Sequence, residues 1–176
     1  MLESIKRTRE ENVKILKGRL RADVNGYIAW LDSHKPTLAV YAGSFNPFHI
    51  GHKYVADQAA KMFDKVILAT GTNPDKLERN EDDKTHHGIY QVQRFSGLLS
   101  DHIKHLAQDY SVALVKGIRN AEDLNYEKVQ ERFLRELYPD INIYYILTDP
   151  SLEHISSSAI KNLMKFNSPV DHYLWK

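Results

Sequence analysis

Apolar residues recur along the chain in two patterns, and the first of them is helical. In residues 1–35 they follow one another at steps of three or four residues, or multiples of these: Ile5, Val13, Leu16, Leu20, Val24, Ile28 and Leu31. This is the spacing of one apolar helix face. Gly26 is expected to break or bend the helix, and Asp32 to Pro36 reads as a short polar hinge. We therefore expect residues 1–35 to form an amphipathic helical extension that packs on the remaining chain or on another subunit.

From Pro36 onwards, short apolar runs alternate with helical patterns. Five runs predict strands, at Thr37 to Tyr41, Lys65 to Ala69, Tyr90 to Phe95, Val112 to Lys116 and Ile143 to Leu147. Four segments predict helices, near Ile50 to Phe63, Gly97 to Gln108, Ala121 to Leu137 and Ser156 to Lys165. The alternation predicts right-handed βαβ units and an α/β fold, with a parallel five-stranded sheet covered by helices on both faces. In such folds ligands bind beyond the carboxyl ends of the strands.

The segment from Val40 to His52, VYAGSFNPFHIGH, follows the first predicted strand and opens a helix. Amides without partners at the helix start, together with the positive end of its dipole, favour anions. Gly51 lets a ligand approach the backbone, and His49 and His52 fall on one side of the first turn. The segment therefore predicts a site where phosphate meets backbone amides, the hydroxyl of Ser44 and imidazole donors.

Composition narrows the class without naming an activity. The chain has 176 residues, of which 42% are hydrophobic and 27% charged, which fits one domain over residues 36–176 after the extension. A net charge of +1 gives no general attraction to nucleic acid or membranes. The absence of cysteine excludes disulfides, cysteine nucleophiles and thiolate metal sites. The first residues, MLESIKRTRE, lack the apolar core of a signal peptide, so we expect a cytoplasmic protein.

The segment GSFNPFHIGH resembles the GxFxPxHxGH signature of the nucleotidylyltransferase superfamily. KGIRNAEDLNYE, from Lys116 to Glu127, is similar to the RGxRxxxDFEYE segment of bacterial phosphopantetheine adenylyltransferases, and ISSSAIK, from Ile155 to Lys161, to their ISSSxVK. NPDK, from Asn73 to Lys76, is similar to their SPSK. The resemblance covers roughly Pro36 to Trp175. It implies a Rossmann-like fold and transfer of an adenylyl group from ATP to phosphopantetheine, giving dephospho-coenzyme A and pyrophosphate.

The resemblance also implies a set of site residues. It gives catalytic roles to His52, Lys76 and Arg119. The ATP-binding residues that it implies are Gly43, Ser44, Phe45, His49, Gly51, His52, Gly117, Ile118, Arg119, Glu127, Leu152, Ile155, Ser156, Ser157 and Ser158. The acceptor-binding residues that it implies are Ser44, Lys76, Leu99 and Lys116.

The chemistry of the reaction agrees with this inventory. A phosphate monoester is largely ionised near neutral pH, because its second pKa is about 6, so its attack on the α-phosphorus needs no strong base. What it needs is alignment of groups that repel one another and donors for the charge that develops. We assign the main transition-state donor to His52, the acceptor phosphate to Lys76 and Lys116, and the ATP phosphates to Arg119.

No resident metal site is predicted. Asp82, Asp83, His86 and His87 lie close in sequence but without a fixed scaffold. Mg²⁺ is expected to arrive with ATP, held mostly by phosphates and water.

Two alternatives stay open at this point. One keeps the fold and changes the acceptor to nicotinamide or nicotinate mononucleotide, or the nucleotide to CTP. The other is a nucleotide-binding module without catalysis, whose leader serves a partner. The segment from Leu77 to Gln93 is about ten residues shorter than in phosphopantetheine adenylyltransferases, which bears on the acceptor. A homo-oligomer is expected, since related bacterial enzymes assemble as hexamers.

Overall fold

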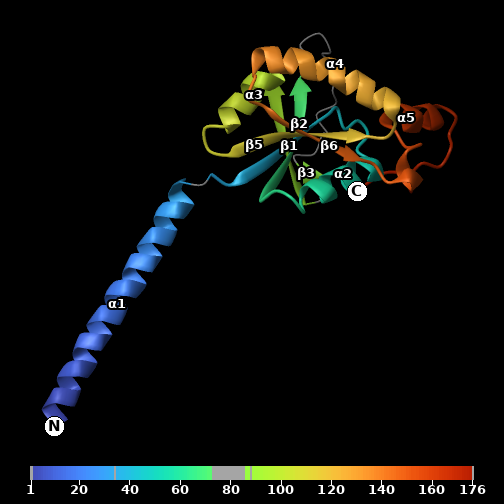
Figure 1. Ribbon diagram of the computed structural model, residues 1–176. Helices are drawn as coiled ribbons and strands as arrows, with labels where there is room; N and C mark the ends of the chain where they lie inside the picture. Colours follow the sequence, from blue (N-terminus) through green and yellow to red (C-terminus); the bar gives the residue numbers. More distant parts are fainter. Residues whose placement is uncertain (1, 34, 73–85, 88, 176) are drawn as a thin grey trace. The chain divides into compact units, whose positions relative to one another are not determined.

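The computed structural model describes residues 2–33, 35–72, 86–87 and 89–175, and divides into two compact units, Met1–Lys35 and Pro36–Lys176. The first unit is one helix, α1 (Leu2–Ser33), in which Tyr27 and Trp30 stack with ring centroids 5.9 Å apart (Figure 1). The helix continues through Gly26, so the break expected there is wrong. One interior glycine costs about 1 kcal/mol, which a long helix tolerates. Among the described residues, no helix is both long and apolar enough to span a membrane.

The second unit is built on one sheet whose strand order is β3-β4-β2-β1-β5-β6. Five of its strands are parallel: β1 (Thr37–Ala42), β2 (Lys65–Thr72), β4 (Tyr90–Ser96), β5 (Ser111–Ile118) and β6 (Asn142–Leu147). They confirm the predicted strands to within three residues at every end. The remaining strand, β3 (His86–His87), pairs with β4 in the antiparallel sense and was not predicted. Two residues are too few to carry a periodic signal.

Helices cover both faces of the sheet, as predicted. Figure 1 shows α2 (Ile50–Ala59) on one side, and α3 (Leu99–Leu106) and α4 (Ala121–Leu137) on the other. The short η1 (Pro150–Leu152) and the helix α5 (Ser157–Lys165) follow β6. The prediction places α4 correctly at both ends, whereas α2 ends four residues before the predicted Phe63.

The two core layers follow from the alternation of side chains along each strand. Ala39 and Tyr41 pack on the α2 side, together with Val55 of that helix. Leu38 and Val40 pack on the other side, with Ile103 of α3. All six side chains are at most 7% exposed. Both faces are therefore apolar, which explains why β1 reads as a continuous apolar run.

The sheet topology determines where a ligand can bind. From the central β1 the chain crosses to β2 on one side, and β5 lies on the other side of β1. The connections after β1 and β5 therefore leave the sheet in opposite directions, over the α2 face and the α4 face. A crevice forms beyond the carboxyl ends of two such strands. The HxGH segment follows β1 and Arg119 follows β5, so both sequence motifs lie at this crevice.

Candidate active site

One polar cleft of about 570 Å³ lies at the carboxyl end of the sheet. Its residues come from the ends of β1, β5 and β6, from the first two turns of α2 and α4, from the first turn of α5 and from the loops that precede α2 and α5. They are Tyr41, Ser44, His49, Gly51, His52, Val55, Gly117, Arg119, Asp123, Tyr126, Glu127, Thr148, Ile155, Ser156, Ser157 and Ser158. We refer to this site as the polar cleft.

Two stacked histidines form one wall of the polar cleft. The rings of His49 and His52 have centroids 3.6 Å apart. Nδ1 of His49 accepts a hydrogen bond from the backbone amide of His52 at 3.3 Å, and Nδ1 of His52 accepts one from the amide of His49 at 3.4 Å. This is a capping box made of two imidazoles. Because each Nδ1 is an acceptor, the donor nitrogen of each neutral ring is Nε2.

His49 is held in its neutral form. Its side chain is buried, with an exposed fraction of 4%. Burial, followed by the charge of Arg119, lowers the pKa of His49 to about 4. A Cβ on Gly51 would lie 3.1 Å from the imidazole of His49, so glycine at this position leaves room for the ring. At neutral pH His49 therefore caps the helix without adding charge to the cleft.

The loop after β1 packs against the ring of His52. The ring of Phe45 meets that of His52 edge to face, with centroids 5.1 Å apart. Phe45 has a φ of 48° and is 4% exposed. A Cβ on Gly43 would lie 3.0 Å from the Phe45 ring, so this close packing needs glycine. The side chain of Phe45 thus positions the catalytic candidate, and does not line the cleft.

The C-terminal segment 170–175 braces the same helix start. The amide of Ile50 donates to the carbonyl of Tyr173 at 2.9 Å, and His49 forms an antiparallel bridge with Leu174. Nζ of Lys53 lies 4.7 Å from the centre of the Trp175 ring, a cation–π contact. This role could not be predicted from the sequence, because it depends on the chain returning to α2 more than 100 residues later.

Arg119 is the fixed cation of the polar cleft. Its Nε and Nη2 donate to the two carboxylate oxygens of Asp123 at 2.8 and 2.9 Å, and its Nη1 donates to the carbonyl of Ile155 at 3.4 Å. The hydrogen bonds to Asp123 raise the pKa of Arg119. Burial opposes ionisation of Asp123, but the hydrogen bonds from Arg119 outweigh it and lower the pKa of that carboxyl. The guanidinium is therefore oriented before any ligand binds.

Lys116 and Glu127 form an ion pair at the edge of the polar cleft. Nζ and Oε2 are 2.9 Å apart, and both side chains are less than one-fifth exposed. An anionic ligand at Lys116 therefore has to compete with Glu127. Glu127 also acts on Tyr41: burial, and then the charge of Glu127, raises the pKa of Tyr41 far above its usual range, so Tyr41 remains a neutral phenol in the cleft.

The serines before α5 combine structural and ligand-facing positions. Ser156 is the N-cap, and its hydroxyl accepts from the amide of Ala159 at 3.0 Å. The hydroxyl of Ser157 donates to the carbonyl of Pro47 at 3.0 Å and so ties α5 to the loop after β1. Ser158 is exposed on the first turn. All three line the polar cleft.

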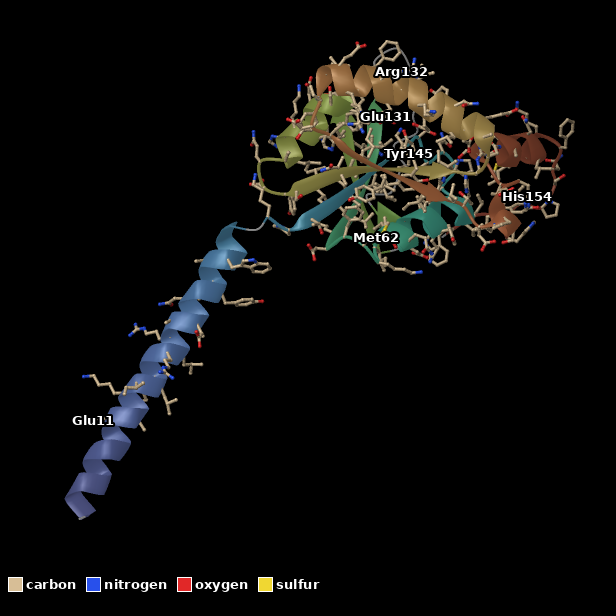
Figure 2. All side chains as sticks on the ribbon, viewed as in Figure 1. Glu11, Met62, Glu131, Arg132, Tyr145 and His154 are labelled. Carbon is tan, nitrogen blue, oxygen red and sulfur yellow. The ribbon has the colours of Figure 1, made fainter. Side chains whose placement is uncertain are left out.

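A second cavity, of about 310 Å³, lies between α4, α3 and the sheet, and we call it the apolar cavity. It is lined by Leu98, Leu99, Ser100, Leu114, Lys116, Tyr126, Glu127, Gln130, Glu131, Phe133, Leu134, Leu137, Ile143 and Tyr145. Tyr126 and Glu127 border both the apolar cavity and the polar cleft. The hydroxyl of Tyr145 on β6 donates to Glu131 of α4 at 2.6 Å (Figure 2). The apolar cavity therefore adjoins the polar cleft along Tyr126 and Glu127.

Most of the site residues implied by the motifs fall in these two spaces. Leu99 and Lys116 border the apolar cavity, and eleven of the ATP-binding residues line the polar cleft: Ser44, His49, Gly51, His52, Gly117, Arg119, Glu127, Ile155, Ser156, Ser157 and Ser158. Gly43, Phe45, Ile118 and Leu152 do not line the polar cleft. Ile118 is buried beside it, and Leu152 packs against the cluster around Ile155 and Ile160. Lys76, Asp82 and Asp83 lie outside the described residues.

Five residues that line the polar cleft were not predicted: Tyr41, Val55, Asp123, Tyr126 and Thr148. Asp123 could have been found, because it stands four residues after Arg119 at a predicted helix start. Tyr41 and Val55 look like core residues in the sequence. They border the cleft only because Tyr41 lies at the carboxyl end of β1 and Val55 lies on α2 beside it.

The sequence matches the cytidylyltransferase-like family over residues 40–163, which is most of the chain. The chain belongs to this family of nucleotidyltransferases. Its relatives include the phosphopantetheine adenylyltransferase of Porphyromonas gingivalis, which is 33% identical over 80% of this chain and 95% of the relative. That of Cytophaga hutchinsonii is 31% identical over 78% of this chain and 95% of the relative. The resemblance that the motifs indicate is thereby confirmed.

Solved structures agree on the fold. A structure from Vibrio parahaemolyticus has a TM-score of 0.55 and 19% identity, and the match covers 80% of this chain and 94% of that one. A bifunctional NMN adenylyltransferase/ADP ribose pyrophosphatase from Francisella tularensis has a TM-score of 0.55 and 14% identity, over 80% of this chain and 45% of that one. The predicted Rossmann-like α/β fold is confirmed.

Proposed function

We propose that this chain transfers the adenylyl group of ATP to phosphopantetheine, giving dephospho-coenzyme A and pyrophosphate. The observation that carries the proposal is the junction of two unlike spaces. The polar cleft has the size and donors for a nucleotide, and the apolar cavity, which Lys116 lines, shares Tyr126 and Glu127 with it. Phosphopantetheine has a phosphate at one end and a long, mostly aliphatic arm, which matches an apolar cavity that begins at a cation.

The reaction needs positioned donors more than a base. An oxygen of the acceptor phosphate forms a bond to the α-phosphorus of ATP, and the bond from that phosphorus to the bridging oxygen of the β-phosphate breaks, releasing pyrophosphate. We assign Nε2–H of His52 as the donor to the α-phosphoryl oxygens, which gain negative charge in the transition state. Arg119 binds the departing phosphates, and Lys116 binds the acceptor phosphate, in exchange for its contact with Glu127.

The backbone amides of Gly51 at the start of α2 and of Ser157 and Ser158 at the start of α5 supplement these side chains, because these three residues line the polar cleft. Amides in the first turn of a helix suit phosphate oxygens. The hydroxyl of Ser44 lies at the same end of the polar cleft. We assign it, with the amide of Phe45, to phosphate oxygens, and Lys76 to the acceptor phosphate.

The charge balance of the polar cleft supports a role for Mg²⁺. Its described lining has Arg119 as a cation and Asp123 and Glu127 as anions, and the contact with Lys116 brings the sum to zero. A triphosphate therefore needs positive charge from elsewhere. Among the described residues no group of three His, Cys, Asp or Glu side chains could hold a metal ion. We assign Mg²⁺ to enter with ATP, bound by phosphate oxygens and water, where it would neutralise charge on the phosphates.

We assign catalysis to residues 36–176 and regard residues 1–35 as an extension that contacts another subunit of a homo-oligomer. The apolar side chains at helical spacing on α1 support this, because one isolated helix cannot bury its own apolar face. Mass measurement by light scattering on the full chain and on residues 36–176 tests it. An unchanged number of subunits per particle would reject the role of the extension. We also propose a cytoplasmic location, where ATP is plentiful. A protein without cysteine has no disulfides that a reducing compartment would break.

The test of the function is pyrophosphate release from ATP and Mg²⁺ with each acceptor separately. We expect release with phosphopantetheine and little with nicotinamide or nicotinate mononucleotide. Replacing ATP by CTP should reduce the rate. If only a mononucleotide supports release, the acceptor is wrong. If no acceptor does so and ATP still binds, the chain is a nucleotide-binding module.

A further inference from the structure

One hydroxyl group in the apolar cavity is buried without a partner. Ser100 is 1% exposed, and its Oγ has no hydrogen-bond partner among the described residues. It lines the cavity, together with Leu98, Leu99 and Leu114. A buried hydroxyl that makes no hydrogen bond destabilises a protein. The oxygen itself exposes less than 1 Å², so it meets a ligand in the cavity only after rotation about χ1, and a ligand that then supplies the missing partner would remove this cost.

The position of Ser100 is suited to a ligand that also reaches Lys116. Ser100 is the second residue of α3, whose N-cap, Leu98, provides no side-chain hydrogen bond to the helix start. On β5, Leu114 and Lys116 face the same side of the sheet, about 7 Å apart along the strand, and both line the cavity. The cavity therefore extends from a cation along an apolar wall, with one buried hydroxyl beside it.

We propose that Ser100 recognises an amide of the acceptor, and is a specificity-determining residue of the apolar cavity. The proposal rests on the proposed function. The arm of phosphopantetheine carries amide groups between aliphatic segments, and an amide offers both a carbonyl acceptor and an N–H donor. A serine hydroxyl can pair with either. The other side chains of the apolar cavity on α3 and β5, apart from Lys116, are leucines, which bind the aliphatic segments without selecting for the amide.

The test is Ser100→Ala with the full chain. Loss of one neutral hydrogen bond should raise the Michaelis constant for phosphopantetheine about 2- to 12-fold. The turnover number and the Michaelis constant for ATP should stay within about twofold, since Ser100 lies outside the polar cleft. The unliganded variant should melt at the same or a higher temperature than wild type, because an unsatisfied hydroxyl has been removed. Ser111→Ala, at an exposed serine on β5, is the matched control and should change nothing.

A second measurement separates recognition from a packing effect. A short alkyl phosphate monoester without an amide should inhibit wild type and Ser100→Ala with equal inhibition constants. An unchanged Michaelis constant for phosphopantetheine in Ser100→Ala would overturn the proposal, as would a lower melting temperature with equal losses for both substrates. If wild type releases no pyrophosphate with phosphopantetheine, the proposed function and this proposal both fail. If only Ser100→Ala departs from expectation, this proposal alone fails.

Discussion

His49 should make the folded protein lose stability as the pH falls from about 7 to 4. The imidazole titrates near 6.5 in the unfolded chain, whereas burial and Arg119 lower its pKa to about 4 in the folded state. Between these values the unfolded chain binds a proton that the folded chain does not bind, so stability decreases with decreasing pH. Protonation also converts Nδ1 from an acceptor to a donor and breaks its hydrogen bond with the amide of His52.

The size of the effect follows from the two pKa values. At pH 5 the linkage relation gives a loss of about 2 kcal/mol relative to pH 8, and below pH 4 the loss approaches about 3 kcal/mol. This is a large share of the stability of an ordinary domain.

Urea unfolding at pH 8, 6.5 and 5 measures this loss. His49→Asn removes the titrating group and keeps a good helix N-cap, so its free energy of unfolding should fall about 2 kcal/mol less than that of wild type between pH 8 and pH 5. His154→Asn changes an exposed histidine (Figure 2) and should follow the wild-type profile. If His49→Asn and wild type show the same pH dependence, His49 is not held neutral by burial, and the reasoning is refuted.

Three further substitutions test other contacts. His52→Ala should lower the turnover number by about two orders of magnitude while ATP binding, measured by calorimetry, largely survives, because a transition-state donor is lost; near-normal turnover would contradict its role. Gly117→Ala places a Cβ 2.8 Å from Cγ2 of Val55, and should cost about 1–3 kcal/mol in urea unfolding. Val55→Ala in the same chain should recover part of that loss, and purely additive losses would contradict the clash. Trp175→Ala removes the ring under Lys53, and should lower the turnover number more than it raises the Michaelis constant for ATP, because it loosens the start of α2; unchanged kinetics would remove the C-terminal segment from the account.

The fold was predictable because its signals are local. Buried parallel strands are runs of β-branched and apolar residues, and these runs stand out between polar turns. The start of α4 is marked by Asn120, whose side chain accepts from the amide of Asp123 at 2.9 Å. The position of the polar cleft also follows from local signals, because motifs that come after parallel strands meet at one edge of the sheet.

The pairings within the site could not be predicted in the same way. The contact between Lys116 and Glu127 depends on how α4 packs over β5, and no spacing rule relates those two positions. Ser100 looks like an ordinary serine in the first turn of a helix, and its burial without a partner appears only in three dimensions. The helix α1 continues through Gly26 because one interior glycine costs only about 1 kcal/mol, too little to end a long helix.

In our proposal the polar cleft and the apolar cavity together select phosphopantetheine as the acceptor. A competition experiment measures this selection, with ATP, Mg²⁺ and equal concentrations of phosphopantetheine and nicotinamide mononucleotide in one reaction, and the products identified by mass spectrometry. The ratio of products reports the ratio of kcat/KM for the two acceptors. We expect dephospho-coenzyme A in large excess, whereas a predominant dinucleotide product would contradict the account.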